Sequence, residues 1–166
     1  VAYAWSGGKD SIVLDLLCRT AGIKDCLFVH SNLEYPAFLA WCMEHMPEGC
    51  HTYNTGLDLN WLKNHPSMLF PKDSTHVYRW YRAVQQTGIR DYFRQHHLDM
   101  MIVGHRKADG NYTGVDGIST NHEGVTRYAP MADWPHELIL ATIAYYDLPI
   151  PPIYGWKNGY RNGTHD

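Results

Sequence analysis

The chain has 166 residues, of which 45% are hydrophobic and 19% charged, with a formal net charge of −3. This length and composition predict one globular domain, residues 1–166, with a loop-rich segment from about residue 147. The charge balance argues against a general attraction to nucleic acid or anionic membranes, and no apolar run approaches the ~20 residues that span a bilayer. We therefore expect a cytoplasmic protein without a membrane partner, and nucleic acid is not indicated as one.

The first half of the chain alternates short apolar runs with helical patterns. Apolar runs of four or five residues predict buried strands, and apolar residues recurring every three or four positions predict helices. In chain order these are a strand at 2–5, a helix from about 10 to 20, a strand at 26–30, a helix over 36–45, a strand at 50–54 and a short helix at 58–64. Residues 64–75 are polar and interrupted by prolines, which favours a loop.

The second half continues the same alternation. It predicts a helical region over roughly 77–97, broken near Gly88, a strand at 99–105, a loop, a hairpin over 118–130 that turns near residues 122–124, and a helix over 134–149. Strands that alternate with helices indicate an α/β domain built on a mainly parallel sheet.

The stretch SGGKDS at residues 6–11 lies between the first predicted strand and the first predicted helix. In this position backbone N–H groups point at an anion, and the helix N-terminus adds a partial positive charge. Gly7 and Gly8 permit positive φ and close approach of a ligand, while Lys9 supplies a positive charge. Asp10 fits beside a polyphosphate if it holds Mg²⁺ or caps the helix. The pattern predicts a phosphate-binding loop, against the alternative of a capped glycine turn.

Two other phosphate-binding motifs are excluded by residue type. A Walker A loop would need glycine at position 3 and Ser or Thr at position 10, where this chain has Tyr3 and Asp10. The dinucleotide fingerprint GxGxxG is absent as well.

SGGKDS resembles the pyrophosphate loop (PP-loop) of the adenine nucleotide α-hydrolase superfamily, which includes ATP pyrophosphatases and phosphoadenosine phosphosulfate (PAPS) reductases. Three further stretches are similar to the PAPS reductase-like branch. They are VHSNLEYPAFLAWC at residues 29–42, IVGHRKADG at 102–110 and YAPMADWPHELILATIAYYDLPIPPIYGWKNGY at 128–160. The resemblance covers nearly the whole chain in order. It implies a three-layer α/β/α fold with a mainly parallel twisted sheet, of the HUP or adenine nucleotide α-hydrolase-like type.

The resemblance also implies roles for individual residues. The loop residues that would hold the phosphates of ATP or PAPS are Ser6, Gly7, Gly8, Lys9, Asp10 and Ser11. When ATP is cut between its α and β phosphates, Lys9 and an Mg²⁺ ion held by Asp10 would neutralise the leaving pyrophosphate. The second strand ends at Val29, His30 and Ser31, where this fold usually places adenine against the backbone.

A second candidate segment follows the strand at 99–105. The family's Gly-x-Arg region at this strand end corresponds to Gly104, Arg106 and Lys107. The resemblance implies that they face the crevice at the strand ends where the nucleotide would bind. Arg106 is the third catalytic candidate, beside Lys9 and Asp10. It suits a phosphate or sulfate because its guanidinium binds such groups in a bidentate manner. The alternative is a solvated pair of basic residues on a surface turn. Asp109 is a weaker candidate for a metal ligand.

Two acidic residues have both a functional and a structural interpretation. Glu34 would hold a metal or the nucleotide, or place a negative charge at a helix N-terminus. Asp133 belongs to the family's closing segment, but its place before a proline favours a helix N-cap.

The stretch at residues 78–82 also leaves alternatives open. Tyr78, Arg79 and Arg82 share one helical face, which predicts either a second anion contact or a solvated surface, the more usual outcome. The aromatic residues there suit the core as well as the interface of a homo-oligomer.

The cysteine content separates the chain from a complete PAPS reductase. Such enzymes attack sulfur with a cysteine in the C-terminal tail, and some relatives add paired cysteines for an iron–sulfur cluster. This chain has Cys18, Cys26, Cys42 and Cys50, no CxxC pair and no cysteine afterwards. We therefore expect reduced thiols and no iron–sulfur cluster.

Three functions remain open. The first, which we prefer, is ATP pyrophosphatase-type adenylylation of an unknown acceptor, with release of pyrophosphate. The second is PAPS reduction with a thiol from a missing tail or a sulfur-carrying partner protein. The third is a nucleotide-binding module without turnover.

Overall fold

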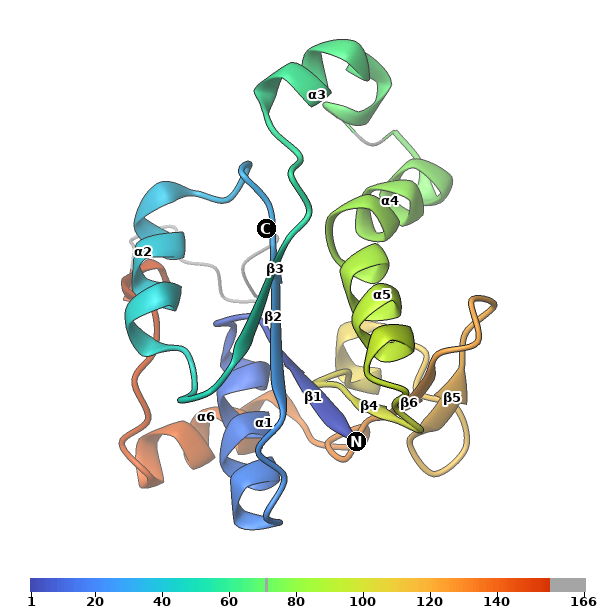
Figure 1. Ribbon diagram of the computed structural model, residues 1–166. Helices are drawn as coiled ribbons and strands as arrows, with labels where there is room; N and C mark the ends of the chain where they lie inside the picture. Colours follow the sequence, from blue (N-terminus) through green and yellow to red (C-terminus); the bar gives the residue numbers. More distant parts are fainter. Residues whose placement is uncertain (71, 156–166) are drawn as a thin grey trace.

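The computed structural model describes residues 1–70 and 72–155, so that the Gly159–Tyr160 pair of the family's closing segment lies outside the described residues. A six-stranded sheet in the order β3–β2–β1–β4–β6–β5 forms the centre (Figure 1). Its strands are β1 (Ala2–Trp5), β2 (Cys26–His30), β3 (His51–Asn54), β4 (Met101–Ile102), β5 (Ile118–Thr120) and β6 (Thr126–Tyr128). All neighbouring strands pair in parallel except β5, which pairs antiparallel with β6. The mainly parallel sheet predicted from the alternating pattern is confirmed.

Helices cover both faces of this sheet. They are α1 (Lys9–Thr20), α2 (Pro36–His45), α3 (Leu59–Asn64), α4 (Ser74–Tyr81), α5 (Thr87–Gln95) and α6 (His136–Tyr145). Shorter helical turns are η1 (Pro66–Met68), the π-helix η2 (Arg82–Gln86), η3 (Lys107–Asp109) and η4 (Pro152–Gly155). Among the described residues, no helix has the length and apolar character needed to cross a membrane.

The alternation of side chains along each strand divides the core into two layers. Tyr3, Trp5 and Phe28 point to the face covered by α1, α2 and α6, and they form one buried cluster. Ala2, Leu27, Met101 and Val103 belong to the other cluster, which packs against α5. In Figure 1, α1, α2 and α6 accordingly lie on one side of the strands and α4 and α5 on the other.

The helical region predicted over 77–97 is continuous but irregular. Its interruption is the π-helix η2 at Arg82–Gln86, and Gly88 lies within α5. A Cβ at Gly88 would come within 2.7 Å of Val29 and 2.9 Å of Tyr53. The predicted break at Gly88 is therefore wrong. Gly88 instead allows α5 to approach the sheet closely.

Two other predictions differ in extent. The strand expected over 99–105 is shorter: β4 is Met101–Ile102, with one further backbone hydrogen bond on each side, from Ala2 to Met100 and from Val103 to Tyr128. The segment expected to be a loop at 64–75 contains η1 and the first residues of α4. The hairpin is confirmed, with Asn121 and Gly124 closing its turn through a backbone hydrogen bond of 3.0 Å.

Candidate functional site

The loop between β1 and α1 wraps closely around the start of the helix. Gly7 has φ +72°, and a Cβ there would lie 2.5 Å from Cys42 Sγ, so only glycine fits without displacement. Gly8 is the N-cap residue of α1 and offers no side chain to the free N–H groups of the first turn. The backbone N–H of Lys9 donates instead to the hydroxyl of Tyr154, at 3.0 Å.

Ser11 holds the loop in this shape. Its hydroxyl donates to the carbonyl of Gly8 at 2.8 Å and accepts the backbone N–H of Ser6 at 3.1 Å. The hydroxyl of Ser6 lies 3.3 Å from that of Ser11. These contacts explain why both serines matter to a loop of this length, since each one ties the strand end to the helix start.

A buried network of charges adjoins the loop. Lys9 Nζ lies 2.9 Å from Asp10 Oδ2, and Arg106 Nε lies 2.8 Å from Asp10 Oδ1. Arg106 Nη2 also pairs with Asp109 Oδ1 at 2.8 Å, and Nη1 donates to the carbonyl of Trp134 at 3.2 Å. The side chain of Arg106 is 0% exposed and that of Lys9 is 4% exposed. Because a buried charge is costly unless it is paired, this network fixes the three side chains relative to one another.

The contact between Asp10 and Arg106 is an ion pair without a hydrogen bond. Asp10 Oδ1 and Arg106 Nε are buried, and within residues 1–70 and 72–155 neither has a hydrogen-bond partner despite their short separation. The opposite charges of Asp10 and Arg106 therefore compensate each other, while Asp10 Oδ1 can still accept a hydrogen bond and Arg106 Nε–H can still donate one.

Two cavities meet above the carboxyl ends of the strands. The phosphate-loop cavity has a volume of about 600 Å³ and is lined by the loop residues Ser6 and Gly8 to Ser11, by Gly104 and His105, and by Tyr154. The aromatic cavity, of about 440 Å³, is lined by Phe28, Phe38, Trp80 and other side chains but by no lysine, arginine or histidine. The residues that line both are Ser6, Val29, Tyr81 and Gln85. Such an edge is where open α/β sheets bind ligands.

Burial changes the ionisation of three groups at these cavities. Burial, with a smaller contribution from Arg127, lowers the pKa of His105 to about 4, so its imidazole is neutral near pH 7. Burial also raises the pKa of Tyr154, which keeps its hydroxyl protonated, and raises the pKa of Glu34 in the aromatic cavity.

The predicted site residues fall into two groups. Those that line the phosphate-loop cavity are Ser6, Gly8, Lys9, Asp10, Ser11, Val29 and Gly104, while Ser31 lines the aromatic cavity. Gly7, His30, Arg106 and Lys107 line neither. Gly7 lies beneath the loop against Cys42, and the ring of His30 stacks on Phe28 with its centroid 5.2 Å away.

The basic pair after β4 divides its roles. Arg106 is buried behind Asp10, whereas Lys107 is 56% exposed and pairs with Asp133 at 2.7 Å. The N-cap of α6 is Pro135, without a side-chain cap, so the N-cap role that we favoured for Asp133 is wrong. The carboxylate of Asp133 pairs instead with Lys107 on the neighbouring loop.

Sequence reasoning did not select His105, Asn111, His136 or Tyr154, all of which line the phosphate-loop cavity. Tyr154 was visible within the family's closing segment. Its contact with Lys9 joins residues 145 positions apart, and no local pattern reports such a pairing.

Mg²⁺ fits this site as a companion of bound phosphates. No group of three or more His, Cys, Asp or Glu side chains suited to a metal ion occurs in the described part of the chain. Each carboxylate oxygen of Asp10 already faces a cation. Mg²⁺ is commonly held by one or two carboxylates together with substrate phosphates, and Asp10 is the carboxylate at the loop.

Comparison with solved structures shows where this architecture recurs. The phosphoadenylyl-sulfate (PAPS) reductase from Candida auris, solved as a phosphate complex, superposes with a TM-score of 0.66 at 16% identity, covering 93% of this chain and 76% of its own. The U34-tRNA thiolase NcsA from Methanococcus maripaludis gives a TM-score of 0.57 at 17% identity, covering 90% of this chain. Yeast FAD synthetase in complex with FAD gives 0.56 at 15% identity, covering 93%.

These likenesses show a shared fold. The chain spans 56% of the thiolase and 52% of the FAD synthetase, so both of those proteins contain additional parts. No curated protein matches the sequence. Residues 1–162 match the phosphoadenosine phosphosulfate reductase domain, which covers the loop, the Gly-x-Arg segment and the whole closing segment. The chain therefore belongs to the phosphoadenosine phosphosulfate (PAPS) reductase domain family.

Proposed function

We propose that this protein binds ATP and adenylylates an acceptor, with release of pyrophosphate. The observation that carries the proposal is Lys9. Its side chain is 4% exposed and lines a cavity of about 600 Å³, and within the described residues its one carboxylate partner is Asp10. Asp10 also pairs with Arg106, so Lys9 shares its counter-ion and can still attract an anion that enters the cavity. The N-terminus of α1 beside it suits the same anion.

The two cavities suit the two ends of the nucleotide. The aromatic cavity offers the flat rings of Phe38 and Trp80 and lacks a cationic side chain, which suits adenine. Val29 and Ser31 at the end of β2 line it, in keeping with the role expected for this strand end. From there the phosphates would cross Ser6 to reach Lys9 in the phosphate-loop cavity.

The reaction then needs charge neutralisation more than covalent help from the protein. An oxygen of the acceptor attacks the α phosphorus, the bond from that phosphorus to the bridging oxygen breaks, and pyrophosphate leaves with the bonding electrons. Lys9 would stabilise the charge on the leaving group, and Mg²⁺ bound through Asp10 and the phosphates would supply further positive charge. Arg106 would act by positioning, because it holds Asp10 and Asp109 in place.

PAPS reduction is the second candidate, supported by the family to which the chain belongs. Burial raises the pKa of the Cys18 and Cys42 thiols to about 12, so neither is an active nucleophile at neutral pH. Cys26 and Cys50 lie with their sulfur atoms 2.7 Å apart at the strand edge opposite the loop. A reductase reaction would therefore draw its thiol from a partner protein or an added thiol donor.

The test is a product assay with two substrates. We expect wild-type protein with ATP and Mg²⁺ to release pyrophosphate, and the Lys9→Met and Asp10→Asn variants to lose at least about 100-fold of that rate. Lys24→Met is the matched control. Lys24 is exposed just before β2, at the amino ends of the strands, whereas the loop lies at their carboxyl ends.

Each alternative has its own readout. Sulfite released from PAPS with a thiol donor, without pyrophosphate from ATP, would replace the proposed activity with the reductase. Tight ATP binding with neither product would mean a binding module. Pyrophosphate release that survives both loop substitutions would show that the site is elsewhere.

A further inference from the structure

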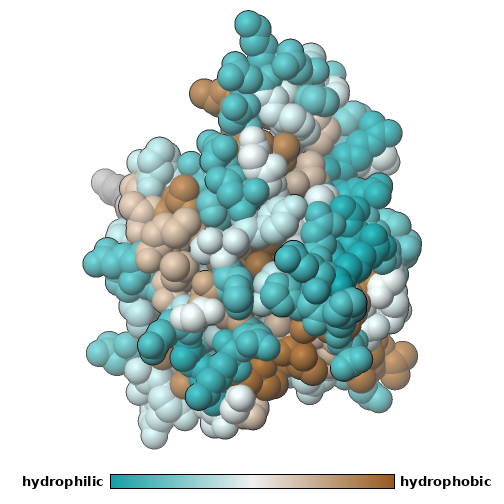
Figure 2. All heavy atoms as spheres, in the orientation of Figure 1, coloured by the Kyte–Doolittle hydropathy of each residue, from teal (hydrophilic) through white to brown (hydrophobic). Residues whose placement is uncertain are grey.

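A cluster of arginines lies where α4, η2 and α5 meet the turn of the β5–β6 hairpin. We call it the arginine face, and its members are Arg79, Arg82, Arg90, Arg94 and Arg127. The hairpin turn contributes Glu123, whose side chain is 6% exposed. Figure 2 shows strongly hydrophilic residues over this side of the molecule, at the right of the view.

The arginine face carries more positive charge than its carboxylates balance. Arg82 Nε and Arg90 Nη1 share Glu123 Oε1, at 3.1 Å and 3.6 Å. Arg90 also pairs with Asp91, at 2.7 Å. Two carboxylates thus serve five guanidinium groups, which leaves a local excess of positive charge on a chain with a net charge of −3.

Three of these arginines have no carboxylate within ion-pair distance in residues 1–70 and 72–155. Arg94 donates to the carbonyl of Glu123 at 3.1 Å, a neutral partner. Arg79 is exposed on the face of α4 that leads to Arg82. Arg127 is half-buried, its Nε has no hydrogen-bond partner within the described residues, and burial lowers its pKa. Contacts with the hairpin therefore account for Arg82, Arg90 and Arg94, but they leave Arg79 unexplained and give Arg94 no charged partner.

The arginine face adjoins the wall of the proposed active site. Tyr81, Gln85 and Ile89 of the same helical segment line the phosphate-loop cavity, and Arg82 and Arg90 directly follow two of them. Their side chains consequently emerge about 100° around the helix from the cavity wall. A ligand bound along the arginines would pass the cavity opening.

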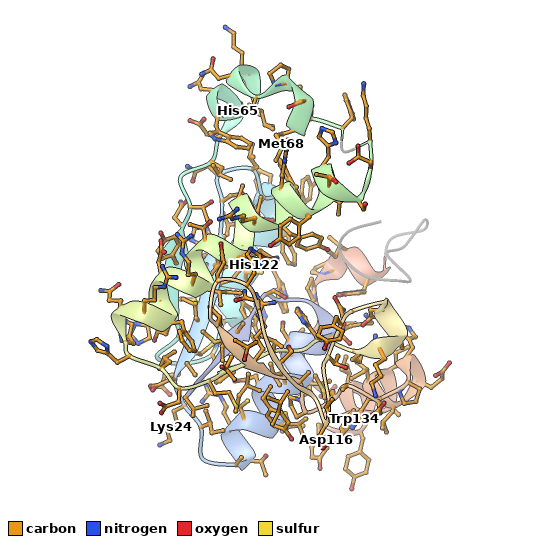
Figure 3. All side chains as sticks on the ribbon, turned by 90° about the vertical axis from the view of Figure 1, so that its right-hand side faces the viewer. Lys24, His65, Met68, Asp116, His122 and Trp134 are labelled. Carbon is orange, nitrogen blue, oxygen red and sulfur yellow. The ribbon has the colours of Figure 1, made fainter. Side chains whose placement is uncertain are left out.

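An aromatic pair marks one end of this surface. The hydroxyl of Tyr78 lies 2.9 Å from His122 Nε2, and the two rings are 5.8 Å apart. Tyr78 is 41% exposed. In Figure 3, His122 projects from the hairpin turn in front of the helical layer. Exposed rings beside arginines are what unpaired bases stack on.

The dimensions indicate a chain of phosphates instead of a single one. From Arg82 to Arg94 the helical segment extends about 18 Å, far more than one phosphate can contact. Phosphates of a nucleic-acid strand recur every few ångströms, and each suits the guanidinium fork. The positions between the arginines are polar, among them Gln86, Thr87 and Asp91, whereas a membrane-binding helix would present an apolar stripe there.

We propose that the arginine face binds a single-stranded segment of nucleic acid and that the acceptor of adenylylation is a group carried on that strand. The second part rests on the proposed function. The first part rests on the charge, length and aromatic content of the surface alone.

The experiment measures fluorescence anisotropy of fluorescein-labelled single-stranded RNA and DNA of mixed sequence over a range of salt concentrations. We expect binding that weakens with salt, so that log affinity plotted against log salt has a negative slope. In Arg79→Gln the magnitude of this slope should decrease by about 0.7. In the Arg82→Gln/Arg94→Gln double variant the slope should fall by about 1.4. Arg19→Gln, in α1 on the opposite face of the sheet, should bind like the wild type.

One further variant, together with Arg79→Gln, separates the effect of charge from an effect on folding. Arg82→Lys/Arg94→Lys keeps the charge and should restore most of the salt slope, while Arg79→Gln leaves all hairpin contacts intact. The proposal is overturned if neither RNA nor DNA binds at low salt, or if Arg79→Gln and the double Gln variant bind like the wild type. Binding to phosphatidylserine vesicles through these arginines, without oligonucleotide binding, would also overturn it in favour of a membrane surface.

The two parts fail separately. Lys9→Met should lose pyrophosphate release and keep oligonucleotide binding, so failure of the proposed function would leave the docking surface standing. If the wild type binds the oligonucleotides but none of them raises pyrophosphate release from ATP, the strand is not the acceptor and the second part is wrong.

Discussion

Tyr154 occupies the place of a ligand at the start of α1. Its hydroxyl accepts the N–H of Lys9, one of the first-turn groups that a phosphate would otherwise use. Tyr154 therefore completes the loop in the free protein and competes with the nucleotide for one donor.

Tyr154→Phe tests this competition. Loss of the hydroxyl leaves the Lys9 N–H unpaired, so the free energy of unfolding without ligand should fall by about 1 kcal/mol. A bound phosphate satisfies the same N–H in both proteins, so the variant should bind ATP a few-fold more tightly. Urea denaturation and titration calorimetry give the two quantities. Weaker ATP binding by the variant would mean that the hydroxyl contacts the nucleotide instead.

Gly7 sets the approach of the loop to α2. Gly7→Ala adds a methyl group both at positive φ and against Cys42 Sγ, whereas Gly22→Ala meets the positive φ alone, with open space around it. We expect Gly7→Ala to lower the free energy of unfolding by roughly 1–3 kcal/mol more than Gly22→Ala. ATP binding should be lost in Gly7→Ala only. Equal effects in denaturation would show that the contact with Cys42 relaxes freely.

At this scale the sequence predicted what is local. Ser6 to Ser11 could be selected because the whole loop is contiguous and its residue types carry the chemistry. The burial of Arg106 could not be predicted, since it depends on Asp10 and Asp109 approaching from different elements. The same limit hid His105 and Tyr154, whose neighbours are set by the fold.

Among the elements, periodicity identified the strands and helices more reliably than their irregularities. β1, β2 and α1 agree closely with prediction because each has a continuous pattern of buried residues. The π-helix η2 escaped prediction because one additional residue per turn does not alter which residue types are present. Gly88 was misjudged because a packing glycine and a helix-breaking glycine look alike in sequence.

The β5–β6 hairpin depends on a charge supplied from within its own turn. Glu123 is nearly buried and holds Arg82 and Arg90, while its backbone carbonyl accepts from Arg94. Glu123→Gln should lower the free energy of unfolding by roughly 1–3 kcal/mol and speed amide exchange in both hairpin strands. Glu44→Gln is the control, with a carboxylate that is 78% exposed. Unchanged exchange in the hairpin would show that the ion pairs do not hold it.

The stability of the whole molecule should fall in mild acid because of His105. Its pKa is about 4 in the folded protein against 6.5 for an ordinary histidine, so between these values the unfolded chain binds more protons. The free energy of unfolding then rises with pH across this window, and acidification from pH 6.5 to 4 removes at most about 3 kcal/mol through this group. Burial also lowers the pKa of His30, which acts in the same direction.

Denaturation at several pH values checks this dependence. His105→Gln should flatten the pH dependence between 4 and 6.5. If the variant and the wild type lose stability in parallel over that range, His105 is not the group responsible.

The contact between Lys9 and Tyr154 also has a consequence for how the protein is made. The loop leaves the ribosome well before its tyrosine, which follows 145 residues later. The sheet has the same character, because β1 at its centre pairs with β4, which is synthesised much later. During synthesis the nascent chain therefore holds an open, unfinished phosphate loop. Competence to bind ATP should therefore arise only after β4 and Arg106 have emerged, because the sheet beside β1 and the charge network at Asp10 are incomplete until then.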